Sequence, residues 1–352
     1  MSLRTTIQKK FQNLFVAVIL NESECVIRCK VLKDGSIKKT FSKTFTTLEE
    51  SETLDKNIEK YLIALQDEYA FVYTIFLLNA MGQGAFVGVE GEDFKKFNVD
   101  MHNVHHVSIK KQWSVYASFI EIKWAKNLFS TVGLDLVYSP FILLNNFVTS
   151  QKLKNRPTCY LLNCQDFFIL AIFEGEKFHF GAFFKTKHDV TFNHAHTTVN
   201  DWEHEVQEEG VSDLEQISTI LDDVESGEDL NDFSPLGDLD DLKTSDSFSD
   251  LDDAKTLGHF QGLEEVRKED TNLELYGRDI LVYKYLKASL EEYYHNPLYH
   301  SEFIEEIIIF DGYEISSELI HQLEDDLMMD VEIHKVDISD RLCDIAIKEV
   351  FQ

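Results

Sequence analysis

A possible nucleotide site lies in residues 305–316, whose sequence is EEIIIFDGYEIS. Three isoleucines and Phe310 predict a buried strand, which runs into Asp311 and Gly312. A new helical pattern begins after Tyr313. Many α/β proteins hold a nucleotide where a buried strand ends in this way and turns into a helix. The same residues also suit a plain strand-to-helix turn, so both interpretations stay open at this point.

Other residues that could do chemistry form weaker patterns. Cys25 and Cys29 are four residues apart on a predicted strand, and therefore about 13 Å apart at a rise near 3.3 Å per residue, which is too far to bind one metal ion. Six histidines lack carboxylate or thiolate partners at metal-ligand spacing, which favours surface positions. They are His102, His105, His106, His188, His194 and His196. No Walker-type loop and no local signature of a Ser-His-Asp or Cys-His nucleophile occurs.

The composition predicts a globular protein that does not bind nucleic acid. Of the 352 residues, 44% are hydrophobic and 12% aromatic, which is enough to bury a sizeable core in one or two domains. The formal net charge of −30 would be repelled by DNA, RNA and anionic lipid surfaces. The acidic residues are concentrated in residues 201–255, which hold 20 of them against only Lys243 and Lys255.

Cysteine usage and hydropathy predict a cytoplasmic protein. Five cysteines without a CxxC pair favour buried free thiols in a reducing compartment. No apolar run approaches the roughly 18 residues that cross a bilayer, since the longest candidates, Ala70–Leu78 and Phe167–Phe173, have the length of core strands. The basic N-terminus MSLRTTIQKKFQ lacks the apolar stretch of a secretory signal.

The first 80 residues predict the element order β-β-β-α-β. Alternating apolar residues around the Asp34-Gly35 turn predict a hairpin within a three-stranded meander. Residues 47–50, from Thr47, predict a capping box for a helix of about five turns. The apolar face of that helix is Leu54, Ile58, Tyr61, Leu62 and Leu65. The predicted strands are Asn13–Leu20, Glu24–Leu32, Ile37–Phe45 and Ala70–Leu78.

The rest of the chain predicts an insertion followed by a second copy of the opening pattern. The insertion and its link have a glycine-rich turn at Gly82–Gly84, strands near Val104–Ile109 and Ser114–Ile122, and helices near Lys123–Thr131 and Pro140–Val148. The second copy has strands Thr158–Asn163, Phe167–Phe173 and Phe178–Phe184, a helix over about 273–294, strand Ile304–Phe310, a helix over about 317–327, strand Val331–Val336 and a helix over about 340–350. Three strands are thus again followed by alternating helices and strands.

A β-β-β-α-β-α unit used twice, with an insertion in the first copy, is the architecture of the actin-like ATPase fold. More specifically, GLDLVYSPFILLNNFV (residues 133–148) and TCYLLNCQDFFILAIFEGEKFHFGAFFKT (residues 158–186) resemble the PilM family of type IV pilus assembly proteins and the cytoplasmic domain of the type II secretion L protein. The resemblance implies an α/β fold of the actin-like ATPase class, ribonuclease H-like and duplicated, with an inserted α+β subdomain. The expected parts are residues 1–80, the first actin-like half; 81–132, the inserted subdomain; 133–200, the link helix and the start of the second half; 201–256, an acidic disordered insertion; and 257–352, the remainder of the second half.

The resemblance also implies where a nucleotide cleft would lie. Proteins of this fold grip phosphate with two glycine-rich hairpin turns, and an aspartate in each turn holds magnesium or orients the attacking water. In the first turn, Ile19 stands at the aspartate position and Asn21 at the glycine. In the second turn, Asn163 stands at the aspartate position and Gln165 at the glycine. The complete degenerate cleft is Ile19, Asn21, Ser23, Asn163, Gln165, Asp166, Asp311, Gly312 and Tyr313.

These replacements predict that the cleft is vestigial. Neither Ile19 nor Asn163 supplies the negative charge that would hold magnesium, and Tyr313 fills the space that a base and ribose would use. A site without both carboxylates loses the electrostatic stabilisation on which phosphoryl transfer depends. We therefore expect no catalytic residue, no metal site and no cofactor, with ATP and magnesium disfavoured.

The acidic segment is predicted to be a flexible loop, because its charges repel one another and few apolar residues compensate. A leucine followed by two aspartates recurs at Leu221, Leu239 and Leu251. Phe233 and Phe248 lie between the charges. The segment is either a solubilising linker or a docking arm that binds a basic, apolar groove on a partner or on the protein's own cleft.

Together these features predict a non-catalytic cytoplasmic scaffold, peripheral to the inner membrane, of a type IV pilus or type II secretion-like assembly platform. The resemblance implies that it binds the short cytoplasmic tail of a bitopic inner-membrane partner in a groove beside the first subdomain and its insertion, and that it contacts a secretion ATPase. One alternative is an active Mg-ATP-dependent ATPase or kinase of the same fold, in which Asp166 or Asp311 takes over the magnesium role. The other is an interaction protein that acts through its acidic arm.

Overall fold

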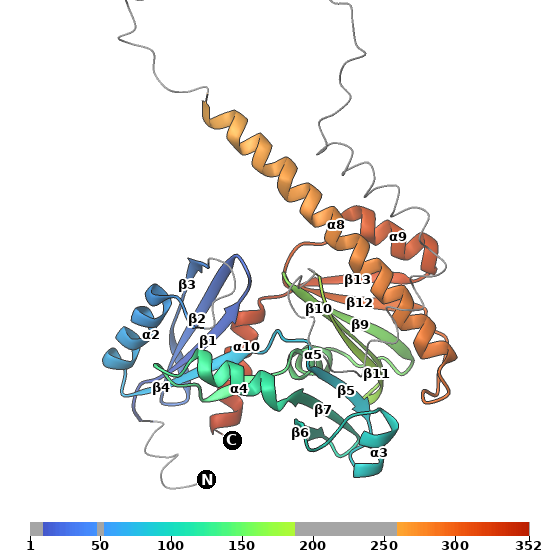
Figure 1. Cartoon of the computed structure of the whole chain (residues 1–352), viewed down its shortest axis with the longest axis horizontal. Coiled ribbons are helices and arrows are strands. Elements are labelled where there is room, and N and C mark those ends of the chain that lie inside the picture. The colour runs from blue at the N-terminus through green and yellow to red at the C-terminus, as the bar shows by residue number, and fades with distance from the viewer. Residues whose placement is uncertain (1–9, 48–52, 187–258, 352) are drawn as a thin grey trace, which may run out of the picture. The chain divides into compact units, whose positions relative to one another are not determined.

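The computed structural model describes residues 10–47, 53–186 and 259–351, and within this last range it describes side chains from residue 275 onward. Figure 1 shows its helices and strands. The acidic segment and three of the predicted surface histidines, His188, His194 and His196, lie outside the described residues. In the described part of the chain, no helix is both long and apolar enough to span a bilayer.

Two five-stranded sheets repeat one topology. The first has the order β3-β2-β1-β4-β8, and the second has the order β11-β10-β9-β12-β13. In each sheet an antiparallel three-strand meander is followed by two strands that run parallel to the first strand of the meander. This repetition confirms the predicted duplication of the β-β-β-α-β-α unit.

Apart from β8, which was not predicted, the elements of the two halves follow the predicted order. The first half consists of β1 (Asn13–Leu20), β2 (Glu24–Lys33), β3 (Ser36–Thr46), α2 (Lys56–Glu68), β4 (Phe71–Leu77), β8 (Leu136–Tyr138) and α5 (Pro140–Ser150). The second half consists of β9 (Pro157–Asn163), β10 (Phe167–Glu174), β11 (Lys177–Lys185), α8 (His259–His295), β12 (Glu306–Asp311), α9 (Ser317–Leu327), β13 (Asp330–Lys335) and α10 (Ile338–Phe351).

Between β4 and β8 the chain forms a third, three-stranded sheet of order β5-β7-β6. Its elements are β5 (Gln83–Val87), α3 (Gly91–Lys96), β6 (Val104–Ile109) and β7 (Trp113–Ser118), and α4 (Phe119–Leu128) follows them. The Trp113 ring stacks on Phe178 of β11 with centroids 4.5 Å apart. The small sheet therefore packs against the second half, although its residues interrupt the first.

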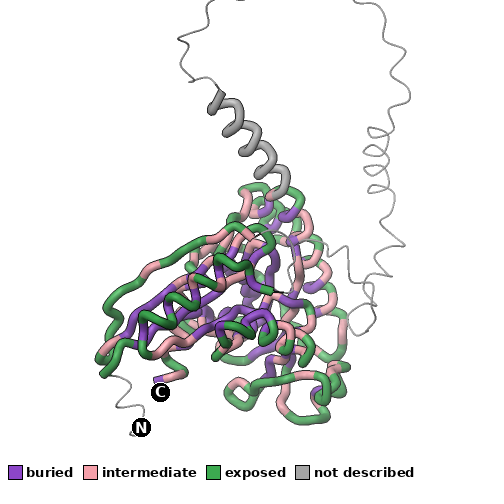
Figure 2. The backbone as a smooth tube through the Cα atoms, turned by 60° about the vertical axis from the view of Figure 1, so that its left-hand side comes forward, coloured by how far each residue is buried: buried purple, intermediate pink, exposed green. Residues whose placement is uncertain are grey.

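The central strands are apolar along their length because both faces of each sheet are covered. All seven residues of β9 are buried. Figure 2 shows buried, intermediate and exposed residues along the backbone. The outer face of the first sheet packs against α2 and α4, and that of the second against α8 and α9. All five cysteines are buried free thiols, as predicted.

Helices α5 and α10 fill the space between the two sheets and join the halves. α5 ends the first half but contacts β9 and β10, whereas α10 ends the second half but contacts β1, β2 and β4. One central core cluster includes Phe15 of β1, Phe147 of α5, Phe310 of β12 and Leu342 of α10. The inner faces of both sheets thus share a single hydrophobic core.

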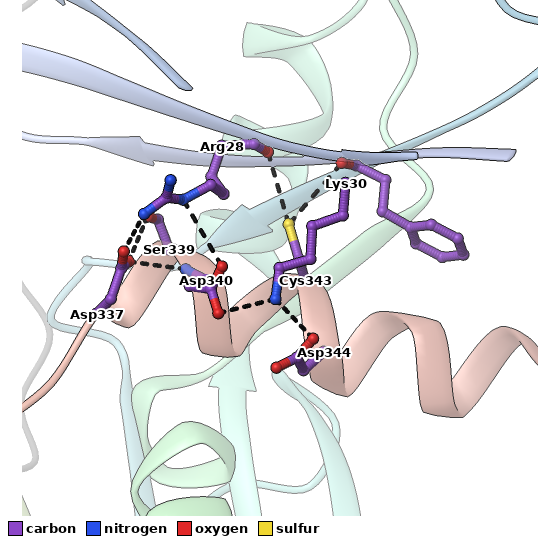
Figure 3. Close-up of polar contacts among 8 residues, drawn as sticks. Arg28, Lys30, Asp337, Ser339, Asp340, Cys343 and Asp344 are labelled. Atoms are coloured by element: carbon purple, nitrogen blue, oxygen red, sulfur yellow. Dashed lines mark hydrogen bonds and ion pairs between the residues drawn. The ribbon is translucent and has the colours of Figure 1, made fainter. Parts of the chain in front are cut away.

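Two cations of β2 hold α10 against the first sheet (Figure 3). The Arg28 guanidinium forms an ion pair with Asp337 and lies 3.9 Å from a carboxylate oxygen of Asp340. Lys30 is only 4% exposed, and its Nζ lies 2.8 Å from Asp340 and 2.7 Å from Asp344. A buried ammonium requires such partners, because burial without compensation would be costly.

The structure corrects three local predictions. The N-cap of α2 is Asp55, which accepts a hydrogen bond from the Asn57 amide, and not Thr47. Gly84 lies inside β5 and not in a turn. A Cβ there would lie 2.6 Å from the Tyr116 hydroxyl, so the close approach of Tyr116 requires a glycine. The strand predicted to continue to residue 122 ends at Ser118, whose hydroxyl accepts from the backbone of α4 and starts that helix.

Candidate functional site

The first two turns of the predicted cleft lie opposite each other, one at the end of each sheet's first strand. The first turn joins β1 to β2, and the Asn21 amide donates to the Glu24 carbonyl over 2.8 Å. The second turn joins β9 to β10, and the Cys164 amide donates to the Phe167 carbonyl over 3.0 Å. Both are tight β-hairpins, as the predicted architecture requires.

Three hydrogen bonds join these two turns directly. Asn21 Nδ2 donates to Gln165 Oε1 over 2.8 Å, and Gln165 Nε2 donates to Ser23 Oγ over 3.0 Å. The Glu22 amide donates to Asp166 Oδ2 over 2.7 Å. In a nucleotide-bound protein of this architecture, phosphate oxygens would lie between the turns and accept such donors. Here the donors are used by the opposite turn.

The third turn closes on the second. Asn163 Nδ2 donates to Asp311 Oδ1 over 2.8 Å, and the Gly312 amide donates to the Asn163 carbonyl over 2.9 Å. A Cβ on Gly312 would lie 2.2 Å from Cδ1 of Ile338, the first residue of α10. The side chain of Ile338 therefore covers the one glycine that remains of the third motif.

A buried arginine that the sequence did not mark lies at the centre of these contacts. Arg278 of α8 is 8% exposed, and its Nε donates to the Gln165 carbonyl over 3.1 Å. Its Nη2 donates to Asn163 Oδ1 and to the Cys164 carbonyl. Its guanidinium carbon lies 5.1 Å from the centroid of the Tyr313 ring. The guanidinium thus binds all three residues of the second turn's apex.

The charge of Arg278 is balanced locally. Burial lowers the pKa of its guanidinium, whereas the neighbouring Asp279 raises it. Nη1 lies 3.5 Å from Asp279 Oδ1, and Asp279 Oδ2 accepts from the Ser316 amide over 2.9 Å. An arginine remains protonated even under such burial, so a fixed positive charge stands beside the second turn.

Ile19, the residue at the first aspartate position, packs against the central hydrophobic cluster between the sheets. Asp311 accepts from Asn163, and its Oδ2 lies 3.5 Å from Lys335 Nζ. With Asp166 hydrogen-bonded to the first turn, both carboxylates of the cleft are engaged by the protein. Among the described side chains, no group of three or more His, Cys, Asp or Glu is arranged to hold a metal ion.

The residues present do not fit a magnesium nucleotide. At the two positions where the resemblance implies carboxylates, the chain has Ile19 and Asn163, and neither carries a negative charge for the cation. The tight contacts between the turns occupy the donors that a phosphate would need. The arrangement joins the two turns through the chain's own hydrogen bonds.

Eight of the nine predicted cleft residues come together. The ninth, Ile19, packs its side chain against the central core cluster. Sequence reasoning missed Arg278, Asp279 and Thr47, the last of which donates through its hydroxyl to the Asn21 and Glu22 carbonyls. The spacing along α8 contains a signal for Arg278, because buried apolar residues follow it at intervals of four. That face is Val282, Leu286 and Leu290.

A separate exposed apolar surface lies on the inserted subdomain. The His105 ring of β6 packs edge-on against Phe119 with centroids 4.2 Å apart, and Val107 follows two residues later on the same face of this edge strand. Val107 is 60% exposed, and Ile120, next to Phe119, is 77% exposed. Met81, which is 53% exposed, precedes Gly82, whose carbonyl accepts from the Ser118 amide directly before α4. We call these five residues the insertion patch.

Comparison of the sequence with family models matches two families whose function is not described. Residues 159–351, more than half of the chain, match the model described as "Domain of unknown function (DUF8341)". Residues 11–145 match the model described as "Domain of unknown function (DUF8569)". A comparison with curated proteins gave no match.

Solved structures similar to this chain share its architecture at low sequence identity. The PilM–PilN type IV pilus biogenesis complex gives a TM-score of 0.47 at 11% identity, over 97% of this chain and 96% of that chain. A protein from Bacteroides thetaiotaomicron with an actin-like ATPase fold and unknown function gives 0.43 at 10% identity, over 98% and 99%. The ethanolamine utilization protein EutJ from Carboxydothermus hydrogenoformans gives 0.38 at 7% identity, over 94% and 88%.

The actin-like ATPase fold predicted from the sequence is confirmed, because the two sheets repeat one strand order around a shared pair of inner helices.

Proposed function

The chain belongs to the family of the domain of unknown function DUF8341, and from this premise and the geometry of its cleft we propose that it is a non-catalytic scaffold of actin-like fold. One observation carries the proposal: the two turns that would grip phosphate are joined to each other, with Arg278 in place of a metal ion. A cleft that is closed by the chain's own hydrogen bonds favours a protein that acts by binding partners on its surface.

The test is isothermal titration of the full chain with ATP and magnesium, together with an assay of phosphate release. We expect no binding heat up to millimolar ATP and no turnover above buffer, because each donor of the turns already has a protein acceptor. An actin-like ATPase titrated in parallel provides the positive control. Micromolar binding with turnover would overturn the proposal and favour the alternative, an ATPase or kinase that uses Asp166 or Asp311 for magnesium.

As its partner we propose the short cytoplasmic tail of a bitopic inner-membrane protein of a type IV pilus or type II secretion-like platform. The resemblance of residues 133–148 and 158–186 to PilM-like proteins supports this partner. The insertion patch supports it independently, because an exposed edge strand next to apolar side chains suits a short extended peptide. The scaffold would then be cytoplasmic and held at the inner membrane through that partner and a secretion ATPase.

A photo-crosslinking amino acid placed at Val107 or at Ile120 tests the proposed partner in cells. We expect both positions to give one shared crosslinked product, a protein with a single membrane span. A crosslinker at Met328, which is 81% exposed on a distant element, is the matched control and should not give this product. Crosslinking of all three positions to the same proteins, or of the patch only to proteins without a membrane span, would contradict the proposed partner.

A further inference from the structure

The hairpin of β10 and β11 contains a β-bulge at His179. Ile172 of β10 pairs with Phe180 of β11, but the next residue, Phe173, pairs with Phe178. His179 is therefore an extra residue without a partner on β10. Residues two apart on a regular strand share a face of the sheet. Here Phe178 instead joins the central core cluster, whereas Phe180 joins the cluster beneath α8, so the bulge directs the two rings to opposite faces.

Each of these two rings contacts a segment outside the hairpin. Phe178 stacks on Trp113 of the inserted subdomain, with ring planes 8° apart. Phe180 packs edge-on against Tyr299, in the loop between α8 and β12, with centroids 4.9 Å apart. The Tyr299 ring in turn lies 6.0 Å from that of Phe97, directly after α3 of the inserted subdomain. The subdomain is thus attached to the hairpin through the two residues that flank the bulge.

The imidazole of His179 is buried, and one of its nitrogens lacks a hydrogen bond. The residue is 5% exposed, and its Nε2 has no hydrogen-bond partner among the described residues. This nitrogen lies 3.3 Å from Glu174 Oε2, but the same carboxylate oxygen lies 3.7 Å from Lys177 Nζ. A protonated imidazole would therefore share its nearest counter-charge with a lysine while it lost nearly all of its water.

The charges around His179 do not compensate for its burial. The charged groups that face the ring come from the hairpin and from the loop before β12, and they are Glu174, Lys177 and Glu302. Burial lowers the pKa of the imidazole and Lys177 lowers it further, whereas the two glutamates raise it, and the pKa remains below its ordinary value near 6.5. At the hairpin tip, Glu176 is paired with Lys110 of the inserted subdomain over 2.7 Å.

The lowered pKa fixes the direction of a pH effect. An opened state, in which water reaches the ring, would bind the proton with an ordinary pKa. The closed state therefore has its full stability above about pH 6.5, and it loses stability relative to the opened state as the pH falls from there to the lowered pKa.

We propose that the bulge is a pH-sensitive hold on the inserted subdomain, in which protonation of His179 loosens the contacts of Phe178 and Phe180 and lets the subdomain move. A bulge can also serve only to twist a hairpin. That role needs no titratable ring at the extra position, whereas a buried histidine responds to pH in the physiological range. The inference goes beyond the proposed scaffold function, since it assigns a control over the subdomain that carries the insertion patch, whatever binds there.

Fluorescence of Trp113 tests the assignment in a W124F/W202F variant of the full chain, which leaves Trp113 as its single tryptophan. We expect the emission to shift to longer wavelength as the pH falls from about 8 to 5, with a midpoint below about pH 6.5, because the ring loses its contact with Phe178. The added change H179Q should abolish this shift. The added change H321Q, which removes a largely exposed histidine of α9, is the matched control and should keep it.

Two charge variants in the same background leave the imidazole in place, and they decide the question even if H179Q does not fold. E174Q removes a carboxylate that favours protonation and should lower the midpoint by roughly 0.5–1 pH unit, whereas K177Q removes a repelling cation and should raise it by a similar amount. No shift in the parent variant, a shift that persists in folded H179Q, or a midpoint that neither charge variant moves would overturn the proposal.

Discussion

A single side chain can take over the electrostatic role of a metal ion. Arg278 is buried at the second turn and donates to Asn163, Cys164 and Gln165, so one guanidinium joins three consecutive residues. Unlike a bound ion, a guanidinium on α8 is always present and has fixed geometry. The turn is therefore held closed by the chain's own covalent structure, and its stability should depend on this one residue.

Replacement of Arg278 by alanine should lower the free energy of unfolding by roughly 3 kcal/mol, because it leaves three buried acceptors without their donor. Urea unfolding followed by tryptophan fluorescence measures this loss. Lys284→Ala, an exposed change on the same helix, should cost less than about 0.5 kcal/mol. Equal effects of the two variants would show that the guanidinium does not hold the second turn.

Ionisation of Asp337 should make the stability of the protein depend on pH in the acidic range. Burial raises the pKa of its carboxyl, but hydrogen bonds from Ser339 and the Asp340 amide, together with Arg28, outweigh burial and leave the pKa below its ordinary value. A carboxyl with a lowered pKa in the folded state stabilises the protein above its unfolded pKa, near 3.9, and loses this contribution as the pH falls through the lowered folded value.

Asp337→Asn should therefore reduce the unfolding midpoint at pH 6 and should have a smaller effect at about pH 3. Thermal unfolding at both pH values measures the difference. Asp325→Asn, on the exposed face of α9, serves as the control for removing one negative charge. If Asp337→Asn lowered the unfolding midpoint equally at both pH values, the ionised carboxylate would not be the source of the stability.

The elements show how the third motif lost the space for a ligand. β12 ends at Asp311 and α10 begins at Ile338, and these two ends meet where Gly312 faces the Ile338 side chain. The contact depends on α10, which the chain reaches only after a further helix and strand. The absence of a Cβ on Gly312 leaves room for the Ile338 side chain.

Gly312→Ala should destabilise the protein by about 1–3 kcal/mol, because the added Cβ would lie 2.2 Å and 2.6 Å from two Ile338 carbons. Ile338→Ala alone should cost about 2–4 kcal/mol through the cavity it leaves. The double variant should lose at least about 1 kcal/mol less than the sum, which chemical unfolding of all four proteins measures. If the losses of the two single variants simply added up in the double variant, this would argue against the contact between Gly312 and Ile338.

At the scale of the whole molecule, the exchange of inner helices makes the two halves depend on each other. α5 packs on the second sheet and α10 on the first, and their apolar residues join one central cluster. The ion pairs of Arg28 and Lys30 with α10 add polar links between the same elements. Neither half can bury its inner face without a helix that the chain places with the other half.

The halves should therefore unfold together. Urea transitions followed by far-ultraviolet circular dichroism and by tryptophan fluorescence should coincide within about 0.2 M in midpoint, because Trp113 and Trp124 report on elements that pack against different halves. Two separated transitions would indicate that the shared core does not couple the sheets.

Local patterns were sufficient to predict the strands of both meanders, their duplication and the actin-like fold. The apolar runs of β1, β9 and β12 are strong signals because these strands are buried on both faces. Short elements escaped prediction: β8 has three residues and α3 has six, too few to show a period. The start of α2 was misplaced because Thr47 and Asp55 are both good caps by residue type.

The sequence predicted which charges the cleft lacks, because the resemblance places Ile19 and Asn163 where aspartates would hold magnesium. Only the tertiary structure decided what replaced them, because Arg278 lies 115 positions from Asn163 and Gln165 lies 144 positions from Asn21. Residue types and spacing carry information about neighbours within a few turns or strands. Contacts over such separations depend on how the sheets and helices pack, and this packing brings the two turns together.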